Sequence, residues 1–243
     1  IESFALYFTG PKQSKARIGN HFSSNVILMA PESLTTQARI IILVVAFLGW
    51  FFGGIQIGIT NLAMHPAAED LIKKAEWAGS LSEQGMTDTV RSWYAYFQCA
   101  FLFGAAVGGF LFGRLGDRIG RTRALGISII WFSAFTGASY VAQNPTQLLL
   151  LRFIACLGVG GCWPNGVALV SEAWSKVARP VMASLIGMAG NVGIFAIATL
   201  GKQYEVTPES WRWVLLIGAT PMLLGLPILF WVKESPSWTA SQK

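Results

Sequence analysis

Charged side chains are scarce in this sequence. Lys, Arg, Asp and Glu make up 12% of the 243 residues, whereas hydrophobic residues make up 53%. Soluble domains carry roughly 25% charged residues, so this chain has about half of the usual supply of groups that face water. The shortage argues against an ordinary soluble domain before any motif is considered.

Cysteine and histidine are scarce as well. Cys99, Cys156 and Cys162 fall inside apolar runs, as small core residues do. Cys156 and Cys162 are six residues apart, so a helix points them in well-separated directions and no disulfide is expected. His21 and His65 stand alone, so we expect no metal site. Because the sequence also lacks a nucleophile–base pair and a phosphate loop, it predicts neither an enzyme nor a cofactor.

Long apolar runs are what the chain has in abundance. A bilayer core needs about 20 apolar residues in helical form, and six stretches meet this length: Ile41–Leu62, Ser92–Gly113, Ala124–Gln143, Gln147–Val170, Val181–Leu200 and Trp213–Val232. Each is apolar all round, as a helix embedded in lipid should be. The sequence therefore predicts an all-α membrane protein, with a six-helix transmembrane bundle over residues 40–233.

The basic residues predict the orientation of this bundle. The net charge is +6, and the basic residues lie in short clusters between apolar runs, which favours a membrane protein over a nucleic-acid binder. Twelve of the eighteen Lys and Arg residues lie on the N-terminal side of the membrane: Lys12, Lys15, Arg17, Arg39, Arg114, Arg118, Arg121, Arg123, Lys176, Arg179, Lys233 and Lys243. Five lie on the other side, and Arg152 is within a span. Basic residues accumulate on the cytoplasmic side, so we expect both termini in the cytoplasm and a multi-pass protein of the cell membrane.

The segments outside the spans divide into three parts. Residues 1–39 form a predicted cytoplasmic arm, which either contacts anionic lipid or is a plain tail. Residues 65–91 form a long extracytoplasmic loop, in which Leu71, Ile72, Ala75 and Ala78 follow helical spacing. That spacing predicts either a short helix on the outer surface or a solvated cap. Residues 234–243 begin a central cytoplasmic loop or form a C-terminal tail.

The most specific motif lies between the second and third spans. It reads Gly-Arg-Leu-Gly-Asp-Arg-Ile-Gly-Arg-Thr-Arg over residues 113–123. Glycines allow a tight turn, and one carboxylate among several arginines forms a charge cluster that can change partners. An ordinary positive-inside loop would explain the arginines but not this order of Gly, Asp and Arg. The segment resembles the signature G-x-L-(A/G)-D-R-x-G-R of the major facilitator superfamily.

Three other segments support the resemblance. The run from Arg152 to Pro164 is similar to the R-x3-G-x-G-x-G-G element of metabolite–proton symporters. Glu172 and Arg179 match the E-x6-R pattern of sugar porters, and residues 233–238 resemble their P-E-S-P-R-(W/Y) ending. Ser237 stands where that ending has arginine. The resemblance covers residues 40–238 and implies the N-terminal six-helix half of such a transporter, closest to these two branches.

The resemblance also implies a cytoplasmic gate and a second bundle. The gate residues would be Gly113, Asp117, Arg118, Gly120, Arg121, Glu172, Arg179 and Glu234. Their charged members would interlock in the outward-open state and separate when the protein opens inward. A complete transporter has twelve helices, so the second six-helix bundle would come from the same chain or from another subunit, unless the protein works as a half.

Polar residues within the spans are candidates for the solute or proton pathway. Arg152 either extends to the outer headgroups or faces a cavity and acts on a proton or an anionic solute. The uncharged candidates, each of which could instead form an interhelical hydrogen bond, are Gln56, Asn61, Gln98, Asn165 and Asn191. Trp50 and Trp163 either stack on a solute ring or fill the bundle.

The membrane cores contain no carboxylate, whereas metabolite–proton symporters carry a D-G-x-D type element in the first span. The first span here reads Phe52-Gly-Gly-Ile-Gln56. Proton coupling is therefore not expected from this half. We expect secondary transport of a small polar solute, an organic acid or a sugar, by alternating access. The alternative is a non-transporting six-helix scaffold or sensor subunit. The expected partners are membrane lipid, the solute and a second bundle, with no nucleic acid.

Overall fold

The computed structural model describes residues 34–175 and 177–242, and within them every regular element is helical. Six segments in this part of the chain are helical, long and apolar enough to cross a membrane, and the last of them consists of two short helices. They are α1 (Thr36–Lys73), α2 (Glu83–Ile119), α3 (Arg121–Ala138), α4 (Pro145–Ala173), α5 (Arg179–Gln203) and the pair α6 (Arg212–Ala219) and α7 (Met222–Trp231). The predicted all-α six-helix membrane bundle is confirmed. Residues 1–33 of the predicted arm lie outside the described residues.

Polar caps determine where several helices begin. The side chains of Thr35, Ser82 and Asn144 accept hydrogen bonds from backbone N–H groups in the first turns of α1, α2 and α4. These bonds satisfy donors that would otherwise lack a partner at a helix start. Pro145 then occupies the first position of α4, where a missing N–H costs nothing. The sixth span is interrupted at Pro221, which separates α6 from α7.

The connection between the first and second spans is shorter than the loop expected over residues 65–91. The helix α1 continues to Lys73 and α2 begins at Glu83, so only the 3-10 helix η2 (Glu76–Ser80) and short links join them. Leu71 and Ile72 are buried in the last turns of α1 and do not belong to a separate surface helix. The expected surface helix is therefore only partly found, because its first residues continue the helix of the first span, whereas Ala78 lies in η2. With 38 residues, α1 is about 57 Å long, against about 30 Å for a bilayer core.

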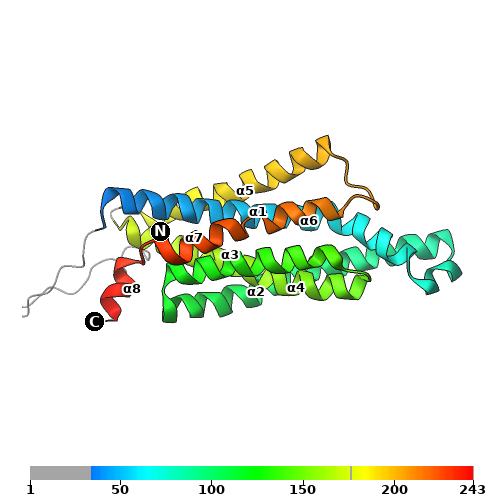
Figure 1. Ribbon diagram of the computed structural model, residues 1–243, viewed down its shortest axis with the longest axis horizontal. Coiled ribbons are helices and arrows are strands. Elements are labelled where there is room, and N and C mark those ends of the chain that lie inside the picture. The colour runs from blue at the N-terminus through cyan, green and yellow to red at the C-terminus, as the bar shows by residue number, and fades with distance from the viewer. Residues whose placement is uncertain (1–33, 176, 243) are drawn as a thin grey trace, which may run out of the picture. The chain divides into compact units, whose positions relative to one another are not determined.

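Glycines allow two pairs of helices to pack at close range. Figure 1 shows α1 beside α5 and α2 beside α4, the pairs that share extensive contacts. A Cβ atom on Gly108 would collide with the carbonyl of Leu157 in α4, and one on Gly54 with the carbonyl of Gly190 in α5. Small residues at these crossings let the backbones approach, which is how helices associate in lipid.

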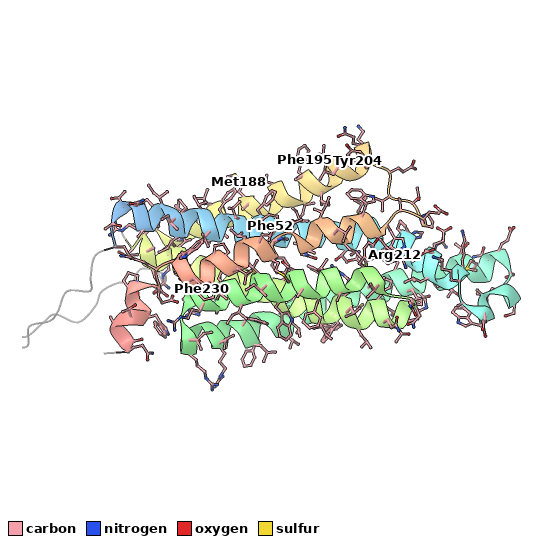
Figure 2. The ribbon with its side chains drawn as sticks, in the orientation of Figure 1. Phe52, Met188, Phe195, Tyr204, Arg212 and Phe230 are labelled. Atoms are coloured by element: carbon pink, nitrogen blue, oxygen red, sulfur yellow. The ribbon has the colours of Figure 1, made fainter. Side chains whose placement is uncertain are left out.

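Large apolar side chains cover much of the outer surface of this bundle. Phe195 and Met188 project from α5, and Phe230 projects from α7 (Figure 2), with Phe195 and Phe230 more than 70% exposed. In water such a surface would favour aggregation, whereas in a bilayer it faces acyl chains. The buried core is also apolar, with Phe97, Phe132 and Trp211 fully enclosed. The bundle is thus largely apolar both inside and outside, with a few buried polar groups such as Arg152 and Asn165.

Candidate functional site

The turn between α2 and α3 depends on two glycines. Gly120 has φ 108°, a conformation that glycine adopts without strain, and a Cβ atom there would collide with the carboxylate of Glu234. A Cβ atom on Gly116 would collide with the side-chain oxygen of Asn165 in α4. The turn is therefore tight and packed from two sides. We call this end of the bundle, which carries Arg114, Arg118, Arg121 and Arg123, the arginine-rich end.

Arg121 is the centre of the ion pairs at the arginine-rich end. Its guanidinium lies 2.6 Å from Asp117 Oδ1 and 3.9 Å from Glu172 Oε1, and it also donates to the carbonyl of Gly113 at 3.4 Å. The side chain of Asp117 is 62% exposed, while those of Arg121 and Glu172 are about one-fifth exposed. The pair with the exposed Asp117 contributes only about 0–1 kcal/mol, and the Arg121–Glu172 pair is long at 3.9 Å, so this network can open at low energetic cost.

The segment after the last span attaches to the same place. The Glu234 carboxylate accepts from the backbone N–H groups of Thr122 at 3.0 Å and Arg123 at 3.4 Å, at the start of α3. A helix N-terminus favours an anion because its N–H groups and dipole both point outward. The Thr122 hydroxyl donates to the carbonyl of Lys233 at 3.0 Å. Glu234 thus joins the last span to the start of the third.

Ser235 and Trp238 add two further hydrogen bonds between residues 233–238 and the arginine-rich end. The Ser235 hydroxyl donates a hydrogen bond to the Glu172 carboxylate. Trp238, in the short helix α8 (Pro236–Ser241), donates its indole N–H to the carbonyl of Asp117 at 3.1 Å. Both residues belong to the motif at residues 233–238, but neither was among the predicted gate residues, although the position of Ser235 beside Glu234 could have suggested a capping role. The ends of α2, α3 and α4 are joined through residues 233–238.

The predicted gate residues are therefore only partly brought together. Asp117, Arg121 and Glu172 share ion pairs, and Glu234 reaches the group through Ser235 and the backbone of α3. Arg118 and Arg179 are exposed, and neither forms an ion pair with another residue that the structure describes.

An apolar groove of about 700 Å³ lies between α1, α2, α4 and α5. The rings of Trp50 and Trp163 line it with their centroids 5.0 Å apart, and Phe110 contributes a third aromatic ring. The other lining residues are small or aliphatic, except for Asn191 on α5. Of the candidate pathway residues, Asn191 is the one that the structure places in the groove lining.

Arg152 lies inside the bundle, away from the groove lining. It is 1% exposed, so it does not extend to the headgroups. Its guanidinium donates to Gln56 Oε1 at 3.1 Å, Thr60 Oγ1 at 2.9 Å and Thr136 Oγ1 at 3.3 Å. Gln56 in turn donates to the carbonyl of Gly218 in α6 at 2.8 Å. This buried arginine network joins α1, α3, α4 and α6, and no carboxylate within residues 34–175 or 177–242 pairs with the guanidinium.

The remaining candidates hold helices together. Asn165 is fully buried and donates to the carbonyls of Phe112 in α2 and Gly161 in α4, both at 2.9 Å. Asn61 in α1 accepts from Gln98 Nε2 in α2 at 3.0 Å, on a more exposed face. Asn165 thus lies behind the turn at Gly116, and the pair of amides lies towards the opposite end of the bundle.

Comparison with protein families identifies this fold. The model of the family described as "Sugar (and other) transporter" matches residues 29–243. The chain belongs to this family of the major facilitator superfamily. It is accordingly a multi-pass membrane protein of a family of metabolite transporters and not an enzyme.

Curated relatives agree with the family. The chain is 31% identical over 198 residues to a putative niacin/nicotinamide transporter of Bacillus subtilis, a match that covers 80% of this chain and 44% of that protein. It is 30% identical over 188 residues to a gentisate transporter of Corynebacterium glutamicum, covering 76% and 39%, respectively. A benzoate transport protein of Acinetobacter baylyi is 27% identical over 224 residues and is matched over 90% and 44%. The matched segments thus span less than half the length of these relatives.

Solved structures agree with the fold. A partially occluded, inward-open structure of the xylose transporter XylE from E. coli superimposes with a TM-score of 0.65 at 20% identity. The match covers 82% of this chain and 50% of that transporter. At such low identity the likeness establishes the fold alone, namely one six-helix half of a transporter of this superfamily.

Proposed function

We propose that the chain forms one half of a secondary transporter that carries a small aromatic metabolite by alternating access, with the apolar groove as its share of the solute pathway. A second six-helix bundle would face the groove and complete the cavity. The observation that carries this proposal is the pair of indole rings, Trp50 and Trp163, on an open concave face between four spans. A ring of the solute would stack against these indoles.

The chemistry of the groove favours a flat apolar ring over a sugar. Sugars need several hydrogen-bonding side chains, whereas the described groove lining offers the Asn191 amide and the indole N–H groups. Aromatic rings gain about 0.5–1.5 kcal/mol from stacking beyond the area that they bury. The relatives named for niacin or nicotinamide, gentisate and benzoate all carry compounds with a single ring. Of the two solutes expected from the sequence, an organic acid fits the groove better.

The arginine-rich end would act as the cytoplasmic gate. The bias of basic residues towards this end supports its placement in the cytoplasm, together with both chain termini. The ion pair of Arg121 with the exposed Asp117, and its long 3.9 Å pair with Glu172, would break and reform as the bundles rock. We include Arg118 and Arg179 in the gate as contacts for the second bundle, since both side chains are exposed.

The buried arginine network supports transport without a proton site in this half. Arg152 is held by the amide of Gln56 and by two hydroxyl groups, none of which titrates near neutral pH. Any coupling to protons would depend on the second bundle. Without such a group there, the protein would carry its solute by facilitated diffusion.

Uptake by the full-length protein in liposomes tests the proposal. We expect saturable uptake of benzoate or nicotinamide, no competition by xylose, and an increase in KM of about 10-fold in Trp163→Ala, since the lost stacking and burial are worth about 1–2 kcal/mol. Trp231→Ala is the matched control because Trp231 is 80% exposed on α7, outside the groove. Uptake of xylose but not of either aromatic compound would refute the solute class. No saturable uptake of any of them would favour the scaffold or sensor instead.

A further inference from the structure

Four polar side chains gather beyond the groove, towards the end of the bundle opposite the arginine-rich end. Gln98 Nε2 in α2 donates to Asn61 Oδ1 in α1 at 3.0 Å and to the Tyr94 hydroxyl at 2.8 Å. His65, one turn after Asn61, lies edge-to-face against the Tyr94 ring with centroids 5.8 Å apart. Asn61 and His65 are exposed, and Tyr94 and Gln98 are half-buried. We call these four residues the amide–tyrosine cluster.

The hydrogen bonds within the cluster leave donors unused. Gln98 fills an acceptor position on both the Asn61 oxygen and the Tyr94 oxygen. The Asn61 Nδ2 group keeps two N–H donors, and the Tyr94 hydroxyl keeps its own proton, because neither donates in any hydrogen bond within the described residues. A surface that presents spare donors in this way recognises an acceptor, and the strongest acceptors in small organic solutes are carboxylate oxygens.

The cluster lies one to two helical turns beyond the groove lining. Asn61 follows the groove-lining Ile57 by one helical turn, about 6 Å along α1 at 1.5 Å per residue. Gln98 precedes the groove-lining Ala105 by two turns, about 10 Å along α2. The hydrogen bond between Asn61 and Gln98 therefore joins α1 to α2 where the groove between them ends. A solute leaving the groove in this direction would meet the cluster first.

We propose that the amide–tyrosine cluster is a binding site for the carboxylate group of the solute, at the outer mouth of the groove. Tyr94 and Asn61 donate to the carboxylate oxygens, Gln98 orients both of them, and His65 holds the Tyr94 ring. The inference rests on the proposed transport of a small aromatic solute. It adds a site for the polar group of that solute, which the apolar groove lacks.

Kinetics of benzoate uptake by the full-length protein test the site. Tyr94→Phe keeps the ring but removes the hydroxyl, which would donate to the carboxylate and which accepts from Gln98. We expect KM for benzoate to rise about 10-fold, since hydrogen bonds to charged groups are strong. Tyr96→Phe is the matched control, because Tyr96 lies two residues away on the same helix, is 54% exposed and donates no hydrogen bond to a described residue. We expect it to keep the wild-type KM. An unchanged KM in Tyr94→Phe would overturn the site.

A second variant separates recognition of the carboxylate from general damage. Asn61→Asp exchanges a donor for a negative charge at an exposed position, where folding should be preserved. We expect KM to rise at least 10-fold more for benzoate than for neutral nicotinamide. An equal change for both compounds would overturn the carboxylate assignment, while uptake itself would still support the proposed function. Wild-type protein that takes up neither compound would instead refute the proposed function.

Discussion

Replacement of Arg152 by methionine should leave the protein as stable as before or more stable. It removes four hydrogen bonds, which the guanidinium donates to the side chain and carbonyl of Gln56 and to the hydroxyls of Thr60 and Thr136. Buried arginines are expensive because the guanidinium loses its hydration, at an effective cost of several kcal/mol. Arg152 is 1% exposed and its partners are the uncharged groups of Gln56, Thr60 and Thr136, so no opposite charge among the described residues offsets that cost.

The partners stay satisfied when the arginine is removed. Gln56 Oε1 still accepts from Thr136 at 3.0 Å, Gln56 Nε2 still donates to Gly218, and Thr60 still donates to the Gln56 carbonyl at 3.0 Å. The smaller side chain leaves a cavity that costs about 1 kcal/mol, at about 24 cal/mol per Å³. The net change in the free energy of unfolding should therefore lie between about 0 and 2 kcal/mol in favour of Arg152→Met, from the relief of desolvation.

Gln56→Leu is the opposite perturbation. It leaves the buried guanidinium without its amide acceptor, and the loss of a hydrogen bond to a charged group costs about 1.5–3 kcal/mol. The double variant should recover most of that loss, because the unpaired charge is gone. Thermal unfolding of purified protein in detergent measures all three, with about 2–4 °C expected per kcal/mol at this chain length. A midpoint for Arg152→Met several degrees below wild type, or below that of Gln56→Leu, would refute the reasoning.

Three other perturbations address the gate and the coupling. Asp117→Asn should slow uptake several-fold without changing the amount of inserted protein, and it should change the free energy of unfolding by no more than about 1 kcal/mol, because Asp117 is exposed. Unchanged uptake would remove Asp117 from the gate. Gly120→Ala should destabilise the protein by about 1–3 kcal/mol, since φ 108° is strained for alanine and the new methyl group displaces Glu234; a midpoint equal to wild type would contradict this. Gln56→Glu introduces a titratable carboxyl group beside the buried guanidinium, so the ratio of flux at pH 5.5 to flux at pH 7.5 should differ from that of the wild type.

The sequence by itself determined which segments span the membrane and where the tightest turn lies. Lipid offers no hydrogen bonds to the backbone, so a run of about 20 apolar residues has to form a helix whatever its neighbours are. The six runs accordingly became six spans, although their helices extend further than the runs, as α1 does to Lys73. The turn at Gly120 was equally readable, because a glycine among charged residues at the end of a span marks a tight connection.

Only the tertiary structure decided which side of each span faces the groove, the core or the lipid. A span that is apolar all round has no periodicity to show its buried face, so Gln56, Asn165 and Asn191 looked equivalent in the sequence. Packing enclosed the first two and left Asn191 in the groove lining. The partners of Arg152 lie 16–96 residues away in the chain, and Glu234 meets the start of α3 across 111–112 residues. Such pairings depend on how the helices cross. The crossings are determined by close contacts between glycines and backbone carbonyls of other helices, and not by local sequence.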